Sequence, residues 1–256
     1  MRVTGCYVMF LAMSMVASNG LAQEPVGGVT ELAPMPDGLD FECLLEPHMT
    51  VKVGTPVPGA LSEVVADRGD VVKKGQLVAR LDSRAQVASV DLSLARAEYA
   101  KRRMERNEEL AQKDLLSSQE QDEMQTDRQL AELELLERRT QVAIREIRSP
   151  VNGVIVERFK GPGEYVQETE IMEIAQIDPL NVEVVVPVRF FGQIKPGMVA
   201  EVRPEDPVGG VYQAKVKVVD KVIDAASSTF GVRLEIPNKS LAIPAGLRCR
   251  AYFPEG

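Results

Sequence analysis

A gap-free internal repeat is the feature that most limits how this 256-residue chain can fold. Residues 55–72 align with residues 149–166, and six of the 18 aligned positions are identical, where average residue usage predicts about one. The identical pairs are Pro56/Pro150, Val57/Val151, Gly59/Gly153, Glu63/Glu157, Gly69/Gly163 and Val72/Val166. A glycine followed by an acidic residue, as at Gly69 and Gly163, is typical of tight turns between short strands. The repeat therefore predicts two similar β-rich halves.

The stretch between the two halves contains neither proline nor glycine and is rich in good helix formers. It predicts a first helix from an N-cap at Ser83 to about Leu110, and a second from an N-cap at Ser117 or Ser118 to about Ile147. Apolar or small residues recur near heptad spacing at Val87, Val90, Leu94, Ala97 and Met104, and again at Met124, Ala131, Leu135 and Val142. Arms of about 28 residues predict an antiparallel helical hairpin about 42 Å long.

The segment after Pro179 changes to a period of two, which is typical of strands with one buried face. Apolar side chains alternate in this way at Val182, Val184, Val186, Val232, Leu234 and Ile236. One short helix is predicted over Arg189–Ile194, because Pro196 and Gly197 follow it closely. None of the polar residues in this segment form a pattern that resembles a catalytic group.

The first residues predict an export signal. Arg2 precedes the apolar run from Val8 to Ala17, and the small residues around Ala22 predict cleavage after that position. The alternative is an uncleaved anchor, but even a helix over Cys6 to Ala17 would be only about 18 Å long, against a hydrocarbon core of about 30 Å. Six Pro or Gly residues in 23–40 predict a flexible leader.

Composition excludes several classes of function. The formal net charge of −8 argues against general binding to nucleic-acid phosphates, which needs clustered cations. One His and three Cys are too few for a zinc or haem centre with ordinary spacing, so neither a metal nor a cofactor is expected. We therefore expect a protein that is not an enzyme.

The export signal, the repeated halves and the helical insert together resemble the periplasmic adaptors, or membrane fusion proteins, of the HlyD-like family, and in particular those of RND-type tripartite efflux pumps. The halves resemble a split lipoyl domain. This resemblance implies a mixed α+β, elongated fold in which an antiparallel hairpin interrupts a lipoyl-like domain and a small β-barrel domain follows. The implied domains are a signal peptide (1–22), a leader (23–40), a strand entering the barrel (41–54), lipoyl-like half 1 (55–82), the hairpin (83–147), half 2 (148–178) and the barrel (179–256).

In that family the hairpin tip docks on an outer-membrane channel through an Arg, a Leu four residues on and a Ser seven residues further. Arg106, Leu110 and Ser117 match this spacing around Leu115, which is the centre of 83–147. The resemblance implies that Arg106 donates to channel oxygens, that Leu110 fills an apolar notch and that Ser117 bonds across the contact. The alternatives are a surface ion pair for Arg106, internal packing for Leu110 and an N-cap role alone for Ser117.

The two cysteines of the mature chain, Cys43 and Cys249, lie on strands that the implied barrel would bring together. Each shares a strand face with apolar neighbours, so both thiols would point inward. A Cys43–Cys249 disulfide is one interpretation, and a pair of buried free thiols is the other.

The function that the resemblance implies is a non-enzymatic adaptor in the periplasm. It would form a hexamer or a trimer of dimers, and it would link an inner-membrane RND transporter to a TolC-like channel. The chain ends where many such adaptors continue into a membrane-proximal domain, so the mode of transporter contact is open.

One alternative is a partner of an ABC-type exporter. A lipoyl or biotinyl carrier is a second alternative, but it needs a modified Lys on a turn between the halves, where only Lys101 and Lys113 of the helical insert occur. A coiled-coil scaffold is a third.

Overall fold

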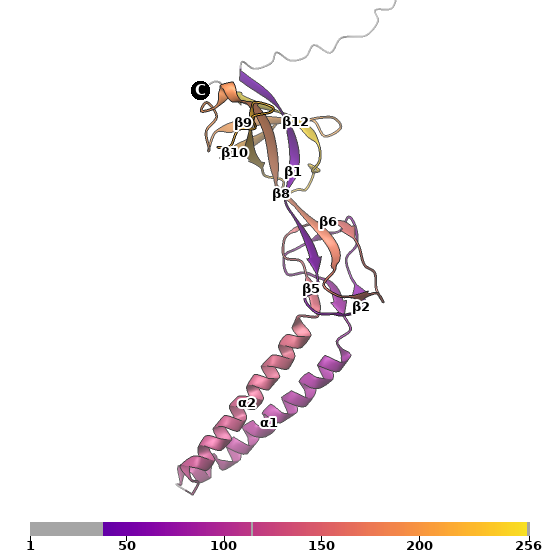
Figure 1. Ribbon diagram of the computed structural model, residues 1–256. Helices are drawn as coiled ribbons and strands as arrows, with labels where there is room; N and C mark the ends of the chain where they lie inside the picture. Colours follow the sequence, from indigo (N-terminus) through magenta and orange to yellow (C-terminus); the bar gives the residue numbers. More distant parts are fainter. Residues whose placement is uncertain (1–37, 114, 255–256) are drawn as a thin grey trace, which may run out of the picture. The chain divides into compact units, whose positions relative to one another are not determined.

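The computed structural model describes residues 38–113 and 115–254, and the chain is a mixed α+β protein with two long helices (Figure 1). The signal peptide predicted over 1–22 lies outside the described residues, as does the predicted leader up to residue 37. Within the two described ranges, no helix is both long enough and apolar enough to cross a membrane.

Six antiparallel strands close into a β-barrel. In order around the ring they are β1 (Gly38–Gly54), β12 (Arg248–Pro254), β9 (Val199–Pro204), β10 (Tyr212–Val219), β11 (Thr229–Ile236) and β8 (Glu170–Pro187), which pairs again with β1. The two strands from opposite ends of the chain, β1 and β12, lie side by side (Figure 1). Because residues 38–40 pair with β12, β1 begins three residues inside the predicted leader. The ring leaves no unpaired edge of the kind that promotes aggregation.

The core of the barrel follows the period of two in its strands. Val182, Val184 and Val186 of β8 are at most 1% exposed, and Leu234 of β11 is fully buried. The residues between them face outward, as expected for a strand with one buried face. The predicted helix over Arg189–Ile194 is wrong. In its place stands a single 3₁₀ turn, η1 (Val188–Phe190), followed by Gly192 in a left-handed conformation (φ 87°) that ends the turn.

Two strands of the barrel, β1 and β8, continue into the lipoyl-like domain. At the crossing, Pro47 pairs with Leu180 and Met49 pairs with Gln176, so His48 alone stands opposite residues 177–179 of β8. Asn238 from the loop after β11 holds this bulged segment. It is 2% exposed, and its backbone N–H donates to Asp178 Oδ1 at 2.9 Å while its Nδ2 donates to the Ile177 carbonyl at 3.0 Å. The side chain of Asn238 and the Ile177 carbonyl thereby gain hydrogen-bond partners where one domain passes into the next.

The lipoyl-like domain packs two small sheets around an aliphatic core. One sheet runs in the order β5 (Glu146–Arg148), β4 (Leu77–Leu81), β2 (Gly59–Val64) and β7 (Tyr165–Val166). The other consists of β3 (Val71–Val72), β6 (Gly153–Arg158) and the continuing parts of β8 and β1. The core includes Leu61, Val78, Leu81, Ile155 and Ile174, each at most 1% exposed.

The sequence repeat reappears as repeated hydrogen bonding. Leu61 accepts from the N–H of Gly163 at 2.7 Å, and the equivalent Ile155 accepts from the N–H of Gly69 at 2.9 Å. Gly69 and Gly163 have φ values of 91° and 86°, a conformation that disfavours any residue with a Cβ. Each half therefore pairs its first strand with the second strand of the other half, as β2 with β7 and β6 with β3.

The insert between β4 and β5 is an antiparallel pair of helices, α1 (Arg84–Gln112) and α2 (Ser118–Ala143). At 1.5 Å per residue the helices are about 43 and 39 Å long. The prediction that the second helix reaches Ile147 is wrong, because residues 146–148 form β5. Ile147 is 4% exposed and pairs with Ala79 of β4, so tertiary pairing overrides local helix propensity there.

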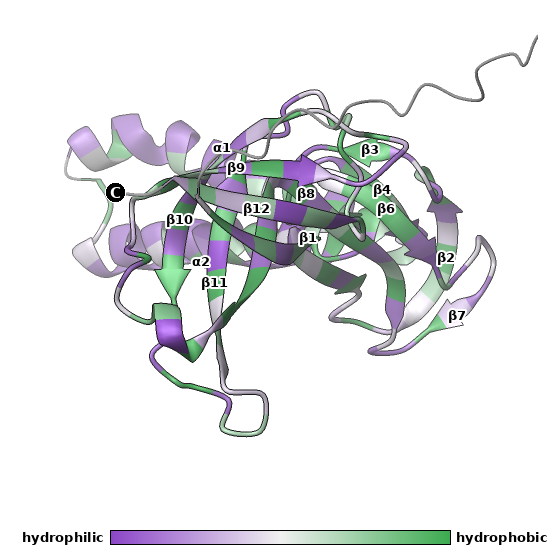
Figure 2. Cartoon of the chain, turned by 90° about the horizontal axis from the view of Figure 1, so that it is seen from above, coloured by the Kyte–Doolittle hydropathy of each residue, from purple (hydrophilic) through white to green (hydrophobic). Residues whose placement is uncertain are grey.

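The hairpin buries few side chains. Of the helix residues whose burial the structure describes, only Ser93, Ala97, Met124 and Leu135 are buried. Val87, which the heptad pattern places in the interior, is 44% exposed. Figure 2 shows the helices as mainly hydrophilic, whereas the strands carry hydrophobic bands. The hairpin is therefore held by a narrow seam of contacts.

Candidate functional site: the tip of the helical hairpin

The two helices are joined at their far end by a short turn. α1 ends at Gln112, and the N–H of Leu115 reaches back to the carbonyl of Leu110 at 2.9 Å. Ser117 then begins α2 as its N-cap. The turn is thus fixed on both sides by hydrogen bonds that helix ends require.

Arg106 is exposed in the second-last turn of α1. The three cations before it each have a partner: Lys101 pairs with Glu105 at 3.8 Å, Arg102 with Glu98 at 3.5 Å and Arg103 with Asp127 at 3.1 Å. Among the described residues, no carboxylate lies within 4.0 Å of the Arg106 guanidinium. Among these residues, the alternative of a surface ion pair from Arg106 to a nearby Glu is therefore not realised, and the Arg106 residue is exposed.

Leu110 lies four residues after Arg106 and so shares a face of α1 with it. Its side chain is 40% exposed. The alternative of internal packing accounts for only part of this side chain. A cation and an aliphatic group are thereby presented next to each other at the tip.

Ser117 forms a complete capping box with Glu120. Its hydroxyl accepts from the Glu120 N–H at 3.2 Å and donates to Glu120 Oε2 at 2.8 Å, while its own N–H donates to Glu120 Oε2 at 3.0 Å. The bonds from the Ser117 backbone N–H and from its hydroxyl lower the pKa of the Glu120 carboxyl. Ser117 is therefore the N-cap of α2, which is one of the two roles considered for it.

Leu115 is the tip residue to which the sequence analysis gave no role. Its side chain is 67% exposed, more than that of Leu110. The signal was available in the sequence, because Leu115 and Leu116 are adjacent leucines in a turn whose other residues are polar. The Arg-Leu-Ser motif does not include these two leucines, because they lie between its Leu and Ser positions.

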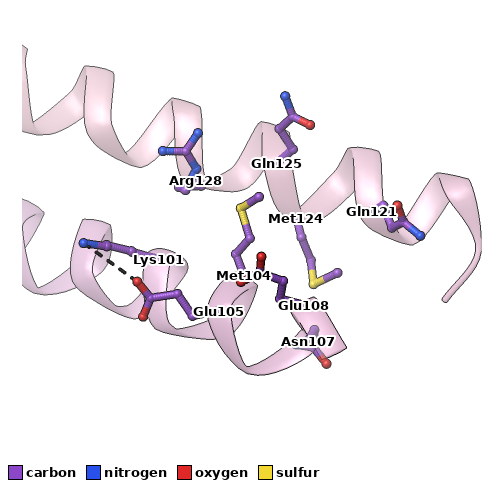
Figure 3. Close-up of a pocket in the computed structure, with 9 residues that line it drawn as sticks. All are labelled: Lys101, Met104, Glu105, Asn107, Glu108, Gln121, Met124, Gln125 and Arg128. Carbon is purple, nitrogen blue, oxygen red and sulfur yellow. Dashed lines mark ion pairs between the residues drawn. The ribbon is translucent and has the colours of Figure 1, made fainter. Parts of the chain in front are cut away.

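A groove of about 360 Å³ lies between the helices just behind the tip (Figure 3). Met104 and Met124, one from each helix, project into the gap, and Met124 is 9% exposed. Charged side chains of both signs form the rim, among them the Lys101–Glu105 pair. Flexible methionine side chains fill irregular space, so the tip rests on adaptable packing.

The predicted cysteine pair is brought together in the barrel. Cys43 of β1 and Cys249 of β12 are directly paired across the two strands, and their sulfur atoms are bonded in the structure. Both residues are buried, at 7% and 2% exposed. This bond links the first and last strands of the barrel.

Known proteins share this arrangement. The family model of the CzcB-like barrel-sandwich hybrid domain matches residues 49–176, half of the chain and the span that holds both lipoyl-like halves and the hairpin. The chain belongs to this CzcB-like family. The membership confirms the resemblance to membrane fusion proteins that the sequence analysis drew.

Relatives of the CzcB-like chain extend the likeness beyond the matched span. The multidrug resistance protein MdtA of Xenorhabdus bovienii is 24% identical over 249 residues, which cover 86% of this chain and 59% of MdtA. An uncharacterized protein of Haemophilus influenzae is 23% identical over 193 residues, 74% of this chain and 50% of that protein. The chain thus spans between half and three fifths of the length of these curated relatives.

Solved structures share the fold. A MacA–MexA chimera containing the Pseudomonas aeruginosa MexA α-hairpin domain has a TM-score of 0.72 and 18% identity, covering 87% of this chain and 83% of the chimera. The membrane fusion protein Spr0693 of Streptococcus pneumoniae has a TM-score of 0.65 and 14% identity, covering 85% of this chain and all of that one. The combination of barrel, lipoyl-like domain and hairpin is therefore a known architecture.

Proposed function

We propose that the chain is a periplasmic adaptor of a tripartite efflux system, linking an inner-membrane RND transporter to a TolC-like outer-membrane channel. The observation that carries the proposal is the hairpin tip, where Arg106 has no carboxylate partner among the described residues and Leu110 is 40% exposed. Both residues are exposed, so another protein can reach them. The role is one of binding and assembly, and transport energy comes from the transporter.

The adaptor acts as a ring in this proposal, either a hexamer or a trimer of dimers. Support comes from the side of α2, where Leu130, Leu133 and Leu136 are 60%, 54% and 60% exposed. Three leucines at a spacing of three residues form a stripe along one side of a helix. Covering such stripes between neighbouring hairpins would help to seal a conduit, and light scattering of the purified protein measures the number of copies.

In-cell crosslinking tests the docking role. A photoreactive amino acid at Arg106 is expected to capture an outer-membrane channel protein, which mass spectrometry identifies. The matched control is the same probe at Glu137, an exposed position near the other end of α2. Absence of a channel adduct from Arg106, in a protein that is folded and exported, would remove the proposed function.

The type of transporter is decided by a separate experiment. Co-purification from detergent-solubilised membranes is expected to recover an RND protein, since helices of 29 and 26 residues form a short hairpin. Recovery of an ABC exporter with its ATPase would assign the chain to that class instead.

The carrier alternative lacks support in the described geometry. The two halves are joined through α1 and α2 rather than by a β-turn, and Lys101 and Lys113 belong to α1 and the turn that follows it. An intact mass with a lipoyl or biotinyl adduct would revive that alternative.

A further inference from the structure

We propose that Leu115, together with Leu110, is the apolar group that enters the channel, and that Ser117 acts by positioning Leu115 rather than by touching the channel. This inference rests on the proposed function and assigns separate roles within the tip. It adds Leu115, which is not part of the three-residue motif, as a contact residue. It also gives Ser117, which is part of the motif, a positioning role.

The position of Leu115 supports a contact role. Its side chain is 67% exposed, against 40% for Leu110, so it offers the larger apolar surface to a partner. The hydrogen bond from the Leu115 N–H to the Leu110 carbonyl ties the two residues to each other. The bond keeps two exposed leucines at the same turn, and burying exposed aliphatic surface is the main favourable term in protein association.

The hydroxyl of Ser117 is already in use. A serine hydroxyl has one O–H to donate, and this one goes to Glu120 Oε2 at 2.8 Å. The Glu120 N–H occupies one acceptor site of the same oxygen. Donating to a channel would require giving up the bond to Glu120 Oε2. The two bonds of the capping box, from the Glu120 N–H to Ser117 Oγ and from the Ser117 N–H to Glu120 Oε2, hold the start of α2 two residues after Leu115.

The neighbouring charge defines the kind of surface that fits. Arg106 lies on the same face of α1 as Leu110 and has no carboxylate partner among the described residues, so a carboxylate or a group of backbone carbonyls should face it. A partner with an apolar notch and oxygen acceptors at its rim fits this tip, and under the proposed function that partner is the outer-membrane channel.

Crosslinking yield tests the role of Leu115. A photoreactive amino acid at Glu109, which is exposed and outside the proposed contact set, reports the channel adduct in cells. Leu115→Ser is expected to lower the adduct yield at least about tenfold, the effect of losing a buried leucine from an interface. Leu92→Ser is the matched control, since this leucine is 58% exposed but lies towards the other end of α1, and its yield should stay within about twofold of the parent.

A second set of variants tests the positioning role of Ser117. Ser117→Asn changes the group presented to the channel but keeps a good N-cap, so the adduct yield should be retained. Ser117→Ala and Glu120→Ala both break the capping box and should lower the yield by similar, smaller factors, and Glu120→Gln should restore it. A loss with Ser117→Asn as large as that with Leu115→Ser would show that Ser117 is itself a contact.

The outcomes separate this inference from the proposed function. No channel adduct in the parent would remove both. A parent adduct that Leu115→Ser leaves unchanged would overturn the inference and leave the proposed function standing. Adducts that join two copies of the chain at the tip, in place of a channel, would also overturn it.

Discussion

The barrel and the hairpin of this chain use apolar residues in different ways. In the barrel, alternate residues of six strands face one closed interior, and its large side chains, such as Leu45, Leu180 and Phe253, are at most 1% exposed. In the hairpin, two long helices share a seam in which Met124 and Leu135 are the buried large side chains among the described residues. Four other leucines on the helices, Leu92, Leu130, Leu133 and Leu136, are more than half exposed.

This difference assigns the folding stability mainly to the barrel and the contacts with other proteins to the hairpin. Burial of aliphatic area is the main source of folding free energy, so the barrel should set the global stability of the chain. The hairpin should open locally at lower cost, because its backbone is exposed and its core is thin. The exposed leucines there are available to other proteins, whereas the buried leucines of the barrel core are not.

The largest expected effect comes from the bond between the first and last barrel strands. Replacing Cys43 and Cys249 together by alanine removes a crosslink across 206 residues and should lower the free energy of unfolding by up to about 5 kcal/mol in the chain-entropy model. Urea denaturation under oxidising conditions measures the change, and the parent protein with reductant is the control. Equal thiol counts in native and in fully reduced, unfolded protein would show that no disulfide forms.

A matched pair of leucines tests the contrast directly. Leu234→Ala in the barrel empties a fully buried site and should cost about 2–5 kcal/mol of unfolding free energy. Leu92→Ala on α1, where the side chain is 58% exposed, should change it by no more than about 0.5 kcal/mol. Similar losses from the two variants would contradict the assignment of stability to the barrel.

The cap of α2 should have a smaller and local effect. Ser117→Ala removes the capping box and should weaken the first turn of α2 by about 1 kcal/mol, which raises amide hydrogen exchange at Glu120 and Gln121 about fivefold. Global unfolding should stay unchanged, because it is set elsewhere. Ser117→Asn, which keeps an N-cap, is the control, and equal exchange in all three proteins would argue against the cap.

The smallest effect is a pH dependence at the same cap. The hydrogen bonds from Ser117 lower the pKa of Glu120 in the folded chain, so the ionised carboxylate favours the capped state. This contribution is fully present above the unfolded pKa of glutamate and is lost as the pH falls through the lower folded value. An NMR titration of the Glu120 carboxyl and the Ser117 N–H measures it. In Glu120→Gln the Ser117 N–H should show no such step, and a midpoint at the ordinary value in the parent would contradict the bond.

Much of the architecture could be predicted because its signals are local. The repeat fixed the two halves through glycines at Gly69 and Gly163 whose backbone conformation few other residues adopt. The lack of proline and glycine between the halves marked the helices. The predicted ends of the helices also placed Arg106, Leu110 and Ser117 around the turn between α1 and α2.

The sequence-based predictions failed where contacts between distant parts of the chain decide the structure of a residue. Ile147 continues a helical pattern in the sequence, but its backbone pairs with Ala79 and its side chain enters the lipoyl-like core. Val87 fits a heptad and yet is 44% exposed, because the helices meet along a narrower seam than the pattern suggests. The periodicity of a segment does not show which other segment of the chain will pack against it.

The sequence by itself determined the two similar halves and the helical insert between them, because both follow from residue type and spacing along the chain. The family followed from the resemblance of this combination to known proteins. Only the tertiary structure decided which side chains remain free. It paired Cys43 with Cys249 by closing the barrel, used the Ser117 hydroxyl within its own cap and left Leu115 exposed. Exposure and hydrogen-bond pairing depend on which segments meet in space, and a single linear pattern does not specify that.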